Sequence, residues 1–120
     1  MYFTNEEKKA IVSVASGMLL ADGSVDAKEV AFNAIVFKAL GISQDELKYG
    51  LETPLSDALQ VIKKMLPHEK RFVAAYLGSV IIADGDISDR ETTLWRAIST
   101  ICELPTMSLA ESPSIMKEFF

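Results

Sequence analysis

Apolar residues recur at helical spacing along most of the chain. Between residues 5 and 20 they follow one another three or four positions apart, and Thr4 and Glu7 form the pattern of a capping box ahead of them. Strand-like alternation bounded by turn residues is missing from the sequence. The pattern therefore predicts an all-α compact bundle of about six to seven helices, the others lying over residues 26–40, 43–50, 54–66, 68–82 and 88–103.

Glycine and proline mark the expected helix ends. Gly41 and Gly50 stand where two helices are expected to stop, because glycine tolerates the left-handed conformation of a helix C-terminus. The last segment, 104–120, is open to two interpretations: a short docking helix that starts at Pro113, or a loose tail. Phe119 and Phe120 at its end favour docking.

The chain contains an internal repeat. A shift of 62 residues places LADG of residues 20–23 on IADG of residues 82–85, and Glu29 on Glu91. One helix–turn–helix unit cannot bury its apolar faces alone, so we expect the two copies to pack together with approximate two-fold symmetry. We therefore expect a single domain over 1–120, with repeat units at about 5–41 and 67–103.

Composition limits the class of protein. Of the 120 residues, 49% are hydrophobic and 24% are charged, which is typical of a folded globular domain. Cys102 is the only cysteine, which excludes an internal disulfide or a cysteine-cluster zinc site and suits a reducing cytoplasm. The first residues lack the pattern of a signal peptide, and no apolar run approaches the ~20 residues of a membrane span. We expect a soluble, cytoplasmic protein.

Charge is concentrated in the repeated turns. The net charge of −5 disfavours nucleic acid or an anionic membrane as the main partner. Segment 21–30 carries a net charge of −2 and segment 83–92 carries −3, so together they account for the whole −5. In the rest of the chain acids and bases balance. The turns are therefore the candidate functional elements.

Each turn matches half of a calcium-binding EF-hand loop. With Gly23 at loop position 6, Asp26 falls at position 9 and Glu29 at position 12, as the loop requires. Positions 1 and 3, which should be oxygen ligands, fall on Met18 and Leu20. In the second copy, too, the residues at positions 6 and 12 match the loop, and the residues at positions 1 and 3 are apolar. A standard EF-hand is excluded, because Ca²⁺ takes about six to eight oxygen ligands.

Two interpretations of the turns stay open. In the first, Asp26 with Glu29 and Ser88 with Glu91 are helix capping boxes, and the Asp-Gly pairs stop the preceding helices. In the second, the two turns lie close together and their carboxylates hold a divalent cation or face a protein partner. Capping accounts poorly for Asp86.

Two stretches, LLADGSVDAKEVAFNAIVFKALGIS and KRFVAAYLGSVIIADGDISDRE, resemble the tellurite-resistance TerB-like family. The resemblance implies a compact helical domain with repeated helix–ADG–helix units and a non-enzymatic accessory role in bacterial stress response. It also implies that acidic residues around the turns bind a divalent metal such as calcium. Ser88 stands where the first copy has Asp26, so the second turn departs from an all-acidic pattern. Carried over by position, the metal ligands would be Asp22, Asp26, Glu29, Asp84, Asp86 and Glu91.

No other residue indicates catalysis. His68 has no serine or cysteine beside it in a nucleophile motif, so we expect a solvated surface residue rather than an enzyme site. Cys102, Trp95, Phe32 and Phe37 fall on apolar helix faces and are expected in the core. The sequence therefore predicts a metal-sensing or partner-binding module. The alternative is a protein–protein interaction module without metal, in which the acids are caps and a docking surface.

Overall fold

The computed structural model describes residues 2–21, 23, 25–83 and 85–120. Within that part of the chain all regular structure is helical, which confirms the predicted all-α class. The helices are α1 (Asn5–Leu19), α2 (Ala27–Ala39), α3 (Gln44–Glu52), α4 (Leu55–Lys63), α5 (Pro67–Ile82), α6 (Asp89–Ile101), α7 (Ser112–Met116) and the 3₁₀-helix η1 (Lys117–Phe119). None of these helices is long and apolar enough to cross a membrane.

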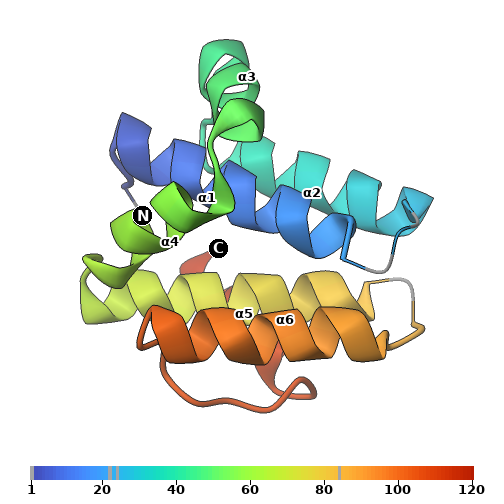
Figure 1. Ribbon diagram of the computed structural model, residues 1–120. Coiled ribbons are helices and arrows are strands. Elements are labelled where there is room, and N and C mark those ends of the chain that lie inside the picture. Colours follow the sequence, from blue (N-terminus) through green and yellow to red (C-terminus); the bar gives the residue numbers. More distant parts are fainter. Residues whose placement is uncertain (1, 22, 24, 84) are drawn as a thin grey trace.

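The two repeat units form two stacked helical hairpins (Figure 1). Helices α1 and α2 make one hairpin, α5 and α6 make the other, and α1 packs on α5 between them. Packing is also reciprocal, because α2 contacts α5 and α6 contacts α1. Helices α3 and α4 lie between the repeats along the chain, and both pack on α1. Each repeat thus covers apolar surface of the other.

The ends of α2 and α6 have the same backbone geometry. Gly41 has a φ of 69°, and the amide of Ile42 donates to the carbonyl of Phe37 at 3.0 Å. Sixty-two residues later, Glu103 has a φ of 57°, and the amide of Leu104 closes the same type of turn at 2.8 Å. The predicted stop at Gly41 is confirmed, and its counterpart forms even without glycine.

The predicted stop at Gly50 is wrong. Helix α3 continues through it to Glu52, and Gly50 is buried against α1. A Cβ atom at Gly50 would lie 2.6 Å from the Cβ of Val12 and 3.0 Å from the carbonyl oxygen of Lys9. Glycine stands here because two helices approach closely, not because a helix ends.

Helix α5 is the central element of the core. Every residue from Phe72 to Ile81 is buried, and the hydroxyl of Tyr76 donates to Oδ1 of Asn33 on α2 at 2.6 Å. Two predicted core residues on α6 and at its end, Trp95 and Cys102, are also buried. The core therefore joins the two hairpins through both packing and a buried hydrogen bond.

Tyr76 makes stability sensitive to alkaline pH. Burial raises the pKa of its hydroxyl well above the ordinary 10.0. The folded state then holds this proton more tightly than the unfolded chain does. The free energy of unfolding is therefore expected to fall as the pH rises above about 10, by up to about 1.4 kcal/mol per pH unit.

Urea unfolding between about pH 8 and pH 11 measures this slope. Tyr76→Phe is expected to reduce the slope, whereas Tyr49→Phe, at a half-exposed ring, is expected to leave it unchanged. The same slope in all three proteins would contradict the assignment to Tyr76.

The C-terminal segment docks on α5, as its phenylalanines indicated. The rings of Phe119 and Phe120 meet the ring of Phe72 edge-on, with centroids 5.4 and 5.8 Å away. Beside them, Arg71 forms a salt bridge with Glu118 at 3.2 Å. The segment is thus part of the fold, and its helix α7 packs on α5.

Candidate functional site

The two acidic turns lie at the same end of the molecule, where α1 and α5 stop and α2 and α6 begin (Figure 1). Each turn also lies beside the other repeat. Ala21 borders the same small hollow as Arg90 at the start of α6, and Ala83 lines the same groove as Lys28 at the start of α2. We call the residues 21–30 and 83–92 together the acidic end.

The glycines of the two turns have matching geometry. Gly23 has a φ of 81° and Gly85 a φ of 82°, and their amides donate to the carbonyls of Leu20 and Ile82, both at 3.0 Å. Such left-handed backbone favours glycine. The predicted left-handed conformation is present, but α1 ends at Leu19 and α5 at Ile82, so these glycines shape the turns after the helices have ended.

The N-caps of α2 and α6 are also as predicted. Oδ1 of Asp26 accepts the amides of Lys28 at 2.8 Å and Glu29 at 3.1 Å. Oγ of Ser88 accepts the amide of Glu91 at 3.3 Å. Asp26 therefore uses one carboxylate oxygen as a cap, which leaves its second oxygen for any other ligand.

Glu29 and Glu91 do more than complete capping boxes. In α1 and α3 the side chain of the glutamate at the third helical position accepts a hydrogen bond from the backbone amide of the N-cap residue. This return bond is absent in α2 and α6, where Glu29 and Glu91 do not accept from the amides of the described caps Asp26 and Ser88. Both side chains turn inward and are almost fully buried, with 3% and 1% of their surface exposed. Each of these residues has a further interaction. The capping-box prediction is therefore only half right.

The structure describes four of the six predicted metal ligands. Asp22 and Asp84 lie outside the described residues. Of the four predicted ligands that the structure describes, Asp86 is exposed, Asp26 is half-buried, and Glu29 and Glu91 are buried. Within the described ranges no three histidine, cysteine, aspartate or glutamate side chains are grouped closely enough to hold a metal ion.

Two of the placed residues, Glu29 and Glu91, are buried carboxylates. Buried carboxylates are held by hydrogen bonds, paired charges or metal ions, because removing a charge from water is costly. Carboxylate oxygens are ligands that suit Ca²⁺ or Mg²⁺. A full shell would need further oxygens from the turns or water.

Other candidate residues give no catalytic arrangement. Burial raises the pKa of the Cys102 thiol, and its Sγ donates to the carbonyl of Leu59 at 3.5 Å, so the thiol is a core group rather than a nucleophile. His68, at the start of α5, is exposed, as expected for a surface residue.

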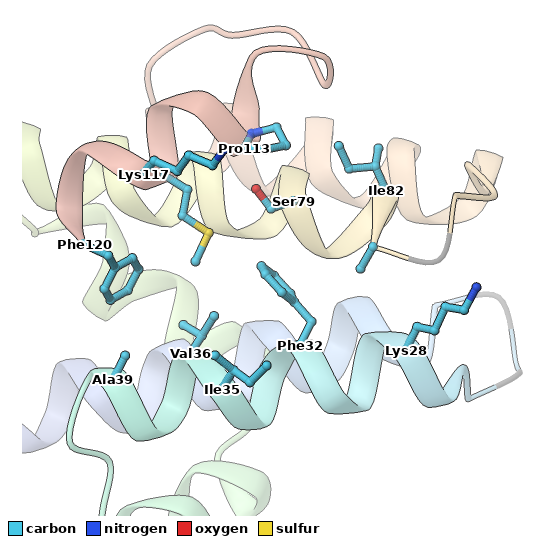
Figure 2. A pocket seen from close by; sticks show the side chains of 12 residues that line it. Lys28, Phe32, Ile35, Val36, Ala39, Ser79, Ile82, Pro113, Lys117 and Phe120 are labelled. Carbon is cyan, nitrogen blue, oxygen red and sulfur yellow. The ribbon is translucent and has the colours of Figure 1, made fainter.

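A feature missed by the sequence is an apolar groove between α2, α5 and the C-terminal segment (Figure 2). We call it the α2–α5 groove. It has a volume of about 790 Å³. Phe32 was expected in the core, but it is only partly buried and stands in this groove. The available signal was that α2 is apolar on all sides, whereas its repeat partner α6 is polar outside.

Fold and site together define a two-repeat helical domain with a conspicuous acidic end. Comparison of the sequence with profiles of known protein families and with curated proteins gave no match. The chain is similar to the protein of unknown function PG1108 from Porphyromonas gingivalis W83, whose crystal structure matches with a TM-score of 0.84. The two are 40% identical, over 98% of this chain and 92% of the other. The chain therefore belongs to the same family as that protein.

Proposed function

We propose that this protein is a non-enzymatic, TerB-like accessory module whose acidic end binds a divalent cation such as Ca²⁺. The proposal includes a cytoplasmic role in a bacterial stress response of the tellurite-resistance type. One observation carries it: Glu29 and Glu91 are buried at matching positions of two helices that begin at the same end. Binding would tighten this end of the bundle and so signal metal to a protein partner.

Comparison with other buried glutamates supports the proposal. Glu46 and Glu69 are also buried, but each accepts a backbone amide from its own helix start, at 2.8 and 2.9 Å. Caps therefore explain their burial. Glu29 and Glu91 do not form this return bond to their described caps, and both have further interactions. A cation bound beside them would offset part of the cost of burying two charged carboxylates.

A second candidate function is protein binding without metal. It is favoured by the exposed carboxylates of Asp86 and Asp89, which suit a basic partner. It predicts that Asp22→Asn with Asp84→Asn leaves stability unchanged in any metal and weakens capture of a partner. A pull-down that this double change does not affect would count against it.

Calorimetric titration of the chelator-treated protein with Ca²⁺, Mg²⁺ and Mn²⁺ tests the cation proposal. We expect binding with a Kd of about 10⁻⁵–10⁻³ M. Glu29→Gln with Glu91→Gln should weaken binding at least about tenfold, since two anionic ligands are lost. Thermal unfolding of the same samples should show metal stabilising only the unaltered protein.

A matched control removes two exposed negative charges elsewhere. Glu52→Gln with Glu103→Gln changes net charge by the same amount and should leave metal binding intact. Absence of both heat and thermal shift at millimolar metal would refute the proposal. So would an equal loss of affinity in the control protein.

A further inference from the structure

The α2–α5 groove has the walls of a small-molecule site. Its volume of about 790 Å³ lies within the ~300–1,000 Å³ typical of ligand pockets. Ser79, the only uncharged polar side chain that lines it among the described residues, donates its hydroxyl to the carbonyl of Ala75 at 2.7 Å. The lining is thus otherwise apolar or cationic. It consists of Lys28, Phe32, Ile35, Val36, Ala39, Ser79, Ile82, Ala83, Pro113, Met116, Lys117 and Phe120.

The charges on the groove are positive. Lys28 stands at one end of it, and Lys117 stands on the wall opposite α2 (Figure 2). Neither lysine forms a salt bridge with a residue that the structure describes. No acidic side chain is among the described lining residues. The groove therefore complements an anionic group attached to an apolar body.

The length of the groove sets the size of that body. Lys28 and Ala39 lie eleven residues apart on α2, which is about 16 Å along a helix. One acyl chain spans half of a bilayer core, or about 15 Å. A single extended chain thus fits between Lys28 and the far end, where Figure 2 shows Phe120.

The internal repeat shows that this groove is not a general consequence of the fold. Its counterpart, the α1–α6 groove, is lined by residues at matching positions: Ala21, Arg90, Leu94 and Ala97 match Ala83, Lys28, Phe32 and Ile35. The α1–α6 groove is smaller, at about 480 Å³, carries an acid and lacks a wall from the C-terminal segment. Of these two grooves, as lined by the described residues, the α2–α5 groove is the one that combines cations, apolar side chains and that third wall.

We propose that the α2–α5 groove binds one long-chain fatty acid, with its carboxylate at Lys28 and its acyl chain along α2 towards Phe120. Lys117 adds positive potential from the opposite wall. Ile35, whose side chain is 68% exposed without a ligand, would be covered by the chain. Lys28 also belongs to the acidic end, so the binding test is made with chelator present to separate this proposal from a metal there.

Titration with oleate, below its aggregation concentration and with chelator present, tests the proposal. We expect saturable binding of one oleate per chain. Ile35→Glu, which places a negative charge where the acyl chain lies, should abolish binding and leave folding intact, since this side chain is exposed. Lys28→Gln should weaken binding about tenfold through loss of a charge-assisted contact.

Two controls isolate the charge. Arg90→Gln, at the matching position of the α1–α6 groove, should leave oleate affinity unchanged. Oleyl alcohol, which has the same chain without the carboxylate, should bind equally to the unaltered protein and to Lys28→Gln. Equal weakening by Arg90→Gln, or full binding by Ile35→Glu, would overturn the proposal.

Other occupants of the groove give distinct results. A dimer in sedimentation that Ile35→Glu dissociates would assign the groove to a second copy of this chain. Flotation with anionic lipid vesicles, abolished by the same substitution, would assign it to a membrane surface. Either result, or no saturable oleate binding, would overturn the assignment to a free fatty acid.

Discussion

Phe72→Ala is expected to lower the free energy of unfolding by about 4 kcal/mol. Phe72 is fully buried, and its ring contacts the rings of Phe3, Tyr76, Phe119 and Phe120, with centroids 5.4 to 5.9 Å apart. Removing the ring leaves a cavity among four aromatic side chains. It also removes the ring that Phe3, near the N-terminus, and Phe119 and Phe120, at the C-terminus, all contact.

Urea unfolding followed by circular dichroism measures this loss. Phe72→Leu is the matched control, because it keeps an apolar side chain of moderate size and should cost much less, about 1 kcal/mol. Amide exchange should show faster opening of the C-terminal segment in Phe72→Ala. A loss below about 1 kcal/mol in Phe72→Ala would contradict the central place of this ring in the core.

Gly78→Ala is expected to destabilise the protein by about 2 kcal/mol, against the ordinary preference of helices for alanine. Gly78 lies within α5, where a Cβ would collide with Oγ of Ser112, reach its Cβ at 2.9 Å and meet Cζ2 of Trp95 at 3.1 Å. Ser112 begins α7 and is fully buried. The added methyl group must therefore push α7 away from α5.

Gly17→Ala provides the matched control, because it is also a helical glycine but has space. A Cβ there would make an ordinary contact with Cδ1 of Leu55 at 3.7 Å. It should stabilise the protein by up to about 1 kcal/mol in the same urea experiment. Because α7 walls the α2–α5 groove, Gly78→Ala should also weaken oleate binding. Opposite changes in the two variants' stabilities are expected, and equal changes would contradict the packing assigned to Gly78.

Local signals in the sequence predicted the hairpins well. Helical spacing located the helices, and the Asp-Gly pairs located both turns, because the left-handed backbone at Gly23 and Gly85 depends on the nearest residues. Contacts between distant segments decided where prediction failed. Gly50 has the sequence signature of a helix end, yet the approach of α1 explains it.

The same limit applies to the candidate site. Thr4 with Glu7 and Asp26 with Glu29 have the same spacing, so the sequence assigns both pairs to capping boxes. Only Glu7 completes its box among these two, while Glu29 turns into the protein. The groove was missed for a similar reason, because its third wall comes from the docked residues 113–120.

We propose that the two turns together bind one cation. Anomalous diffraction from crystals of the full chain grown with Mn²⁺ tests it most directly, since Mn²⁺ accepts the same carboxylate ligands. We predict one strong peak at the acidic end, within coordination distance of the Glu29 and Glu91 carboxylates. No peak there, or a peak whose protein ligands come from one turn alone, would contradict the account.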